Sequence, residues 1–272
     1  LNTDYSIISG GIGTGSNTVT LRWLTTGSKT VTINYNNASG CSALSATSST
    51  ATNVTGPTAT AGAALTAICS GGTSAAMGGT IGGTATVGTW SGGTGTWTNA
   101  TNPSTATYTA GASESGTVTL TLTTSGGACG TTTATKNITV NARPTVTFTA
   151  QPGASACANT DVTYTTQSGQ SNYVWTVPGV LNTDYSITSG GIGTSSNTVT
   201  LRWLTTGSKT VSVNYTNASG CSATSATSST ATTVNARPTV TFTAQAGASA
   251  CANTDVTYTT QSGQSNYVWT VP

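Results

Sequence analysis

The acidic side chains are the groups of this sequence that could most directly catalyse a reaction. Histidine, the usual general base, is absent from the 272 residues. The five carboxylates are Asp4, Glu114, Asp161, Asp184 and Asp255. Glycoside hydrolysis needs two carboxylates flanking the scissile bond, and only Asp161 with Asp184 could form such a pair within one folded unit. Because each also suits a turn or a strand end, we expect no catalytic site and no enzyme.

Metal and cofactor sites have equally little to build on. Calcium needs several oxygen ligands, usually from clustered acids, and the acids here stand apart in the sequence. No Cys-x-x-Cys spacing is present, so neither a zinc site nor a redox site is expected. The sequence predicts no cofactor, and a calcium cage made of backbone carbonyls is the one alternative left open.

Six cysteines carry the remaining covalent chemistry. Their spacing predicts one disulfide in each repeat, Cys69 with Cys129 and Cys157 with Cys221, 60 and 64 residues apart. In the loop-entropy model, closing a loop of this length stabilises a domain by roughly 4 kcal/mol, and disulfides place a chain outside the cytoplasm. The two cysteines expected to pair outside the given residues are Cys41 and Cys251. Free buried thiols are the alternative.

Two tryptophans, Trp90 and Trp97, flank the glycine-rich stretch in TWSGGTGTW. This stretch lacks the Gly-Lys-Ser/Thr ending and the following helix of a phosphate loop, so it predicts a hairpin turn. If exposed, the two rings could stack on a sugar or a solid surface. Packing into a core is the alternative, and their large apolar area favours it.

The elements that must position these residues are strands. Charged residues make up only 4% of the chain, so the polar surface is built from β-branched Thr and turn-forming Gly, Ser and Asn. Strong helix formers are scarce, with one Glu, three Lys and one Met. The composition therefore predicts an all-β protein.

The pattern of charged and apolar residues argues against two kinds of partner, nucleic acid and the membrane interior. The net charge of +2 comes from seven cations and five acids that are scattered singly. No basic patch could neutralise a row of phosphates, so we expect no nucleic-acid partner. No apolar run approaches the roughly 18 residues of a membrane helix, so we expect no membrane insertion.

Internal repetition divides the chain into four parts. Residues 181–235 repeat residues 1–55 with eight differences, and residues 236–272 repeat residues 142–178 with one. Residues 142–235 are therefore one complete repeat of type A, and residues 56–141 form a different repeat of type B. Residues 1–55 are then the C-terminal part of a type A repeat, and residues 236–272 the N-terminal part of a further one.

The two partial repeats allow two interpretations. In the first, the given residues are a window cut from a much longer repetitive polypeptide. In the second, the partial repeat at one end of a copy completes the partial repeat of the next copy by donated strands.

Alternating apolar and polar residues predict the strands and their buried faces. Four clear runs are TVTLRW, KTVSVNY, NYVWTV and TVTLTLTT. About seven such runs in each repeat fit an immunoglobulin-like sandwich, whereas the repeat is too long for a solenoid. Successive repeats meet through Ala-Arg-Pro, in which Pro restricts the backbone. We expect tandem sandwiches joined by short linkers into a semi-rigid rod.

Two stretches resemble repeat modules of known surface proteins. The type A run NTVTLRWLTTGSKTVSVNYTNASGCSA has the Trp, Gly, Val-x-Val-x-Tyr-x-Asn and Gly-Cys order of PKD-like domains with an immunoglobulin fold from Bacteroidota. The type B run GGTIGGTATVGTWSGGTGTWTN resembles a second repeat of the same proteins. The resemblance covers essentially the whole chain and is to giant adhesins of the SprB gliding type. It implies export by the type IX secretion system, a cell-surface location and a role in adhesion or gliding.

Three functions remain open at this point. We expect a structural stalk of a secreted cell-surface adhesin or filament, whose partners are neighbouring repeats of the same long chain. One alternative is a multivalent module that binds polysaccharide or solid surfaces weakly through many repeats. The other is an extracellular fibre that self-associates laterally through its Thr-rich edges or head to tail.

Overall fold

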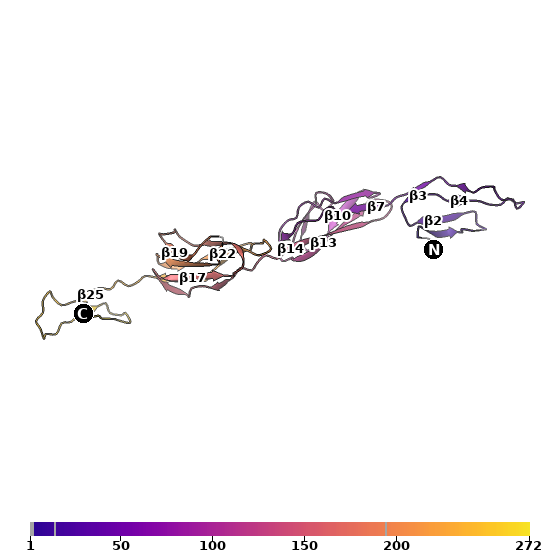
Figure 1. Cartoon of the computed structure of the whole chain (residues 1–272). Coiled ribbons are helices and arrows are strands. Elements are labelled where there is room, and N and C mark those ends of the chain that lie inside the picture. Colours follow the sequence, from indigo (N-terminus) through magenta and orange to yellow (C-terminus); the bar gives the residue numbers. More distant parts are fainter. Residues whose placement is uncertain (1–2, 14, 194) are drawn as a thin grey trace. The chain divides into compact units, whose positions relative to one another are not determined.

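The computed structural model describes residues 3–13, 15–193 and 195–272. The regular structure of these residues is all β-strand, and they contain no helix long and apolar enough to cross a membrane. The chain divides into two compact units, residues 1–143 and 144–272. Figure 1 shows the chain with some of the strands labelled. The four-part division into repeats stays a prediction.

The complete type A repeat forms two layers of strands. One sheet has the order β15-β17-β20-β19. The other layer contains β18-β22-β23 and β16-β24-β21, in which β21 leads into β22 and β23 into β24. The strands are β15 (Phe148–Ala150), β16 (Ser155–Cys157), β17 (Asp161–Thr166), β18 (Ser171–Thr176), β19 (Tyr185–Gly190), β20 (Thr198–Trp203), β21 (Gly207–Lys209), β22 (Ser212–Thr216), β23 (Thr227–Ser228) and β24 (Thr232–Asn235).

The alternating runs supply the core between these layers. Val199, Leu201 and Trp203 of β20 are fully buried, whereas Arg202 between them is exposed. The apolar side chains of β17, β18 and β22 join them in one cluster. The predicted strands and their inward faces are confirmed in this repeat, because each period of two residues places one side chain on each side of the sheet.

The type B repeat also forms two layers of strands, with a different sequence and a different strand order. A four-stranded sheet has the order β10-β13-β14-β8, and β7-β9 and β11-β12 form the opposite layer. A bridge from Thr73 to Thr109 and a hydrogen bond from Met77 N to the Ala106 carbonyl connect the segment that leads into β9 with β12 and the residue before it. The strands are β7 (Pro57–Thr60), β8 (Ile68–Cys69), β9 (Thr80–Gly83), β10 (Val87–Ser91), β11 (Thr96–Thr98), β12 (Thr107–Thr109), β13 (Gly116–Ser125) and β14 (Thr133–Asn141).

The partial repeats contain the matching subsets of strands. Residues 3–55 form the pairs β1-β2, β3-β6 and β4-β5, and residues 236–272 form the pair β25-β26. These strands are β1 (Tyr5–Gly10), β2 (Val19–Trp23), β3 (Gly27–Lys29), β4 (Thr32–Ile33), β5 (Thr47–Ser48), β6 (Thr52–Val54), β25 (Phe242–Ala244) and β26 (Thr259–Thr260). The same sequence pattern therefore gives the same local pairing without a closed core.

Candidate functional site

Asp161, one half of the carboxylate pair that catalysis would need, lies in an ion pair. Its carboxylate accepts hydrogen bonds from Arg202 Nε at 2.7 Å and Nη2 at 3.2 Å, directly across the β17–β20 ladder. The Arg202 hydrogen bonds lower the pKa of Asp161. A carboxylate held ionised by a cation and open to solvent is a poor proton donor.

Asp184, the other half of that pair, closes the turn before β19. Its carboxylate accepts hydrogen bonds from the Val180 N–H at 2.8 Å and from the Thr205 hydroxyl at 3.2 Å. Thr205 in turn accepts a hydrogen bond from Lys209 Nζ at 2.9 Å. The two aspartates thus make different local contacts. In the sheet, β20 lies between β17, which begins at Asp161, and β19, which follows Asp184.

Glu114 of the type B repeat is the acid with the most internal partners. It accepts hydrogen bonds from the Tyr108 hydroxyl at 2.5 Å and from the N–H groups of Thr94 and Gly111, each at 2.9 Å. Burial acting alone would raise the pKa of Glu114, but these hydrogen bonds outweigh it and lower the pKa. Burial and Glu114 raise the pKa of Tyr108. The cluster stabilises the loop around a fully buried tyrosine.

Acid should destabilise the type B repeat through Glu114. The pKa of Glu114 in the folded state lies below its ordinary value. The stabilisation by its carboxylate is therefore complete at pH values above the ordinary pKa, and it is lost as the pH falls through the folded-state pKa. We expect Glu114→Gln to cost about 2 kcal/mol of unfolding free energy at pH 7. The substitution should also flatten the acid limb of the pH–stability curve, measured by denaturant unfolding from pH 7 to pH 3. An unchanged acid limb would contradict this role.

The two tryptophans beside the glycine turn pack inward to different degrees. Trp90 is 2% exposed, and its Nε1 donates to the Pro103 carbonyl at 2.9 Å. Trp97 is half-buried, donates to the Gly92 carbonyl at 3.2 Å and stacks on Trp90 with centroids 5.9 Å apart. Trp90 therefore cannot present a ring face to a ligand, and Trp97 alone stays a candidate for surface binding.

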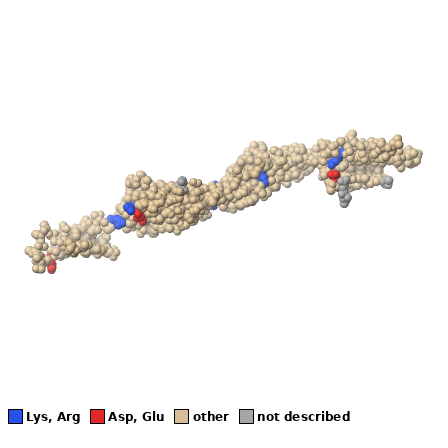
Figure 2. All heavy atoms as spheres, in the orientation of Figure 1, with Lys and Arg blue, Asp and Glu red and all other residues tan. Residues whose placement is uncertain are grey.

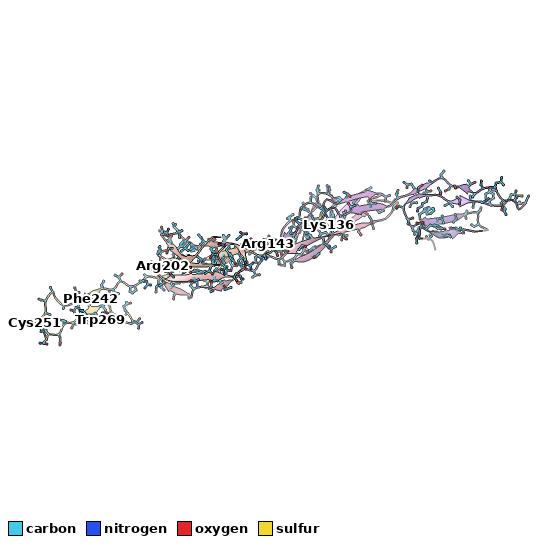
Figure 3. The ribbon with its side chains drawn as sticks, in the orientation of Figure 1. Lys136, Arg143, Arg202, Phe242, Cys251 and Trp269 are labelled. Carbon is cyan, nitrogen blue, oxygen red and sulfur yellow. The ribbon has the colours of Figure 1, made fainter. Side chains whose placement is uncertain are left out.

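Lys136 is a buried cation, which the composition and charge pattern of the sequence do not predict. Its Nζ donates to the carbonyls of Ala63 at 2.8 Å and Met77 at 2.6 Å and lies 5.6 Å from the centroid of the Trp90 ring. Burial lowers its pKa. A signal was present, because Lys136 shares its strand face with the apolar Ile138 and Val140. Figure 3 labels Lys136 within the type B repeat.

The cysteines correct the sequence-based prediction of disulfides. Cys129 and Cys157 carry free, exposed thiols, as do Cys41 and Cys251. Cys69 and Cys221 are disulfide-bonded. The predicted pairs Cys69–Cys129 and Cys157–Cys221 are therefore not those of the structure.

Distance within each sandwich explains the correction. Cys69 lies beside Asn141 at the end of β14, whereas Cys129 lies in the turn that precedes β14. The length of β14 separates them by roughly 27 Å, and a disulfide needs Cα atoms about 4.4–6.8 Å apart. Cys157 likewise lies beside Asn235, near the start of β21, while Cys221 follows the far end of β22. The two cysteines of a repeat are at its opposite ends.

Alkylation should distinguish the two sets of cysteines. In the unreduced chain we expect iodoacetamide to label the four free cysteines and to spare Cys69 and Cys221 until a reductant is added. Peptide mass spectrometry measures this directly. Cys129→Ser is the matched control, since it should leave Cys69 protected, whereas a Cys69–Cys129 bond would leave Cys69 newly labelled.

The described residues offer no cluster for a metal ion. No group of three or more His, Cys, Asp or Glu side chains comes together there. On the face drawn in Figure 2, the Lys, Arg, Asp and Glu side chains form a few small spots, in some of which blue and red lie side by side. The acids described above each act within a turn or a ladder.

The fold defines tandem immunoglobulin-like domains. Labelled in chain order, β15-β17-β20-β19 is the A-B-E-D sheet of the immunoglobulin sandwich, and β18-β22-β23 is its C-F-G sheet. In both complete repeats the early strand β16 or β8 pairs parallel with the last strand, β24 or β14. The all-β, immunoglobulin-like prediction is confirmed.

Comparisons with known proteins match structures but not sequences. No family model and no curated protein matches the chain. Solved structures that align with it include the D00-D0 domain of intimin, at 15% identity over 66% of this chain and 99% of that one, with a TM-score of 0.33. The I9-I11 tandem of titin aligns at 10% identity over 87% and 84%, with a TM-score of 0.33. The adhesin InvE of Yersinia pseudotuberculosis aligns at 21% identity over 66% and 58%, with a TM-score of 0.24.

Proposed function

We propose that this chain is a structural repeat region of a secreted cell-surface adhesin, a spacer and not the part that recognises a ligand. The observation that carries the proposal is that two different repeat sequences both form a sandwich in which an early strand pairs parallel with the last strand. What the two repeats share is a closed sandwich with its own core. A function that depends only on the sandwich tolerates such divergence in sequence.

The contacts of the acidic and tryptophan side chains support the role of a spacer. Asp161, Asp184 and Glu114 are engaged in turns and ladders, and Trp90 is buried. The linker arginines act in the same way: Arg143 Nε donates to the Ser70 carbonyl and Arg237 Nε to the Ala158 carbonyl, each at 2.8 Å. Each arginine thus ties the linker back to the repeat that precedes it.

The bonded cysteines and the resemblance to surface proteins support an extracellular location. A disulfide persists in an oxidising environment, and Cys69 and Cys221 are bonded. The resemblance to PKD-like repeats of Bacteroidota adhesins supports export by the type IX system and a role in adhesion or gliding. We propose these as the setting of the protein.

Replacement in the producing cell tests the spacer function. Deleting residues 56–235 should reduce attachment, and replacing them with two unrelated immunoglobulin-like sandwiches of similar length should restore it. If the replacement is as damaging as the deletion, the repeats themselves bind the surface. Trp97→Ala then identifies the second candidate function, because loss of attachment in that variant would assign binding to the half-buried ring.

A further inference from the structure

The core of the complete type A repeat contains two polar atoms that bond to no protein group. The side chains of Tyr164 and Trp203 are fully buried. Within the described residues, neither the Tyr164 hydroxyl nor the Trp203 Nε1 makes a hydrogen bond to the protein. Buried polar atoms almost always have a partner, because burial without one costs the free energy of removing the atom from water. Two such atoms in one core indicate a small ligand that both can bind.

These two atoms approach a third polar group from the opposite layer of the sandwich. Tyr164 lies on β17 and Trp203 on β20, which are neighbours in one sheet. Thr232 is also fully buried and lies on β24 in the facing layer. Burial raises the pKa of Tyr164, and the nearby side chains of Thr232 and Trp203 partly oppose that rise. The three polar groups therefore converge between the two layers.

The hydrogen-bonding capacity of the three groups matches a molecule that both donates and accepts. Trp203 Nε1 can only donate, whereas the Tyr164 hydroxyl can donate and accept. Thr232 Oγ1 donates to the Gly153 carbonyl at 3.0 Å, and its lone pairs can still accept. A water molecule can accept from Trp203, donate to Thr232 and bond to Tyr164 in either direction.

An ion fits the same groups poorly. The three side chains offer two oxygen atoms, and a calcium ion takes at least about six oxygen ligands. An anion would be buried without a cation bonded to it, which is costly. The nearest cation described is Lys209, whose Nζ lies 5.4 Å from the centroid of the Trp203 ring and donates to the Thr205 hydroxyl. A neutral ligand is therefore favoured.

Other buried tryptophans of the chain show the usual arrangement, in which a carbonyl accepts from the indole. Trp90 Nε1 donates to the Pro103 carbonyl at 2.9 Å. Trp175 Nε1, in the same type A core, donates to the Ser196 carbonyl at 2.8 Å. The indole without a protein partner is thus particular to one site and not a general property of these sandwiches.

We propose that the complete type A repeat holds an internal water molecule between Tyr164, Trp203 and Thr232. Internal waters typically make about three hydrogen bonds to groups that lack other partners, and three groups are present. The water joins the sheet of β17 and β20 to β24 of the facing layer, so it is part of the core. The proposal is independent of the spacer function.

Contacts between water and the indole N–H groups test the proposal in the 272-residue chain with nitrogen-15-labelled tryptophan. We expect the Trp203 indole proton to show a nuclear Overhauser effect to water, with the sign that a long-lived bound water gives. Trp90 and Trp175 are internal controls, since each donates to a carbonyl and should show no such effect. A Trp203 indole proton without a contact to long-lived water would overturn the proposal.

Tyr164→Phe provides a thermodynamic test because it removes only the hydroxyl. We expect the unfolding equilibrium constant of the complete type A repeat, measured with denaturant, to rise about 10-fold. The water signal at Trp203 should weaken in the same variant. A buried hydroxyl that bonds to nothing would behave in the opposite way, since its removal leaves stability unchanged or raises it. An unfolding constant that stays the same or falls would therefore contradict the site.

A double-mutant cycle tests whether one water serves both layers. Thr232→Val combined with Tyr164→Phe should raise the unfolding constant by less than the product of the two single effects, because both act through the same molecule. Ser229→Ala is the matched control. Its hydroxyl is also buried, but it accepts from Val211 N at 3.0 Å, so its effect should multiply with that of Tyr164→Phe. Independent effects of Thr232→Val and Tyr164→Phe would rule out a shared water.

Discussion

Trp203→Ala should strongly destabilise the complete type A repeat while the rest of the chain keeps its stability. Trp203 is fully buried in the core, packs edge-on against Tyr185 with centroids 5.9 Å apart and lies under Lys209. Removing a buried tryptophan costs about 3–5 kcal/mol, a large part of the 5–15 kcal/mol that stabilises a typical domain. Hydrogen exchange followed by mass spectrometry should show residues 144–235 exchanging far faster.

Trp23→Ala is the matched control, since Trp23 occupies the same position in residues 3–55. It is half-buried and keeps the same tyrosine and lysine neighbours. Without a covering sheet its loss should change exchange only locally, in β1 and β2. Eight sequence differences allow peptides from the two copies to be told apart by mass. Equal effects of the two substitutions would mean that the covering sheet adds nothing to burial at this position.

Gly93→Ala should strongly destabilise the type B repeat at the turn between β10 and β11. Gly93 has φ of +70°, and a Cβ there would overlap the Tyr108 hydroxyl and ring. Tyr108 is fully buried, and its hydroxyl accepts from Gly95 N at 2.9 Å while donating to Glu114. We expect a loss of about 3–4 kcal/mol, the sum of backbone strain and overpacking, measured by denaturant unfolding.

Gly71→Ala separates the cost of backbone strain from the cost of overlap with Tyr108. Gly71 has φ of +71° in the same repeat, and a Cβ there meets nothing within 4 Å. It should therefore cost only the strain of the left-handed backbone, about 1 kcal/mol. If Gly71→Ala and Gly93→Ala destabilise equally, the contact with Tyr108 does not constrain the turn.

The sequence predicted which residues face the core, because strand alternation depends only on neighbours along the chain. Val211, Val213 and Tyr215 are buried as their run indicates, and so are Leu120 and Leu122 of the type B repeat. The same logic has a limit: Val31 and Ile33 carry the identical pattern and are exposed, because burial needs the second sheet. Alternation predicts which side chains share one face of a strand, and the covering layer determines whether that face is buried.

The cysteine pairs could not be predicted in the same way. Spacing along the chain shows that Cys69 and Cys129 are 60 residues apart, but not that β14 places them at opposite ends. The hydrogen bonds to Glu114 were hidden for a related reason. Its partners Tyr108, Thr94 and Gly111 come close to Glu114 only after two loops come together. No local sequence pattern predicts these contacts.

The parallel pairing of the early and last strands has a mechanical consequence. In the complete type A repeat β16 lies beside β24 with Ser155 opposite Thr233 and Cys157 opposite Asn235, and the type B repeat pairs β8 with β14 in the same sense. Tension along the chain pulls two such strands past each other, so their hydrogen bonds are strained together and not one after another. A sandwich held in this way yields at a higher force than a hairpin peeled from its end.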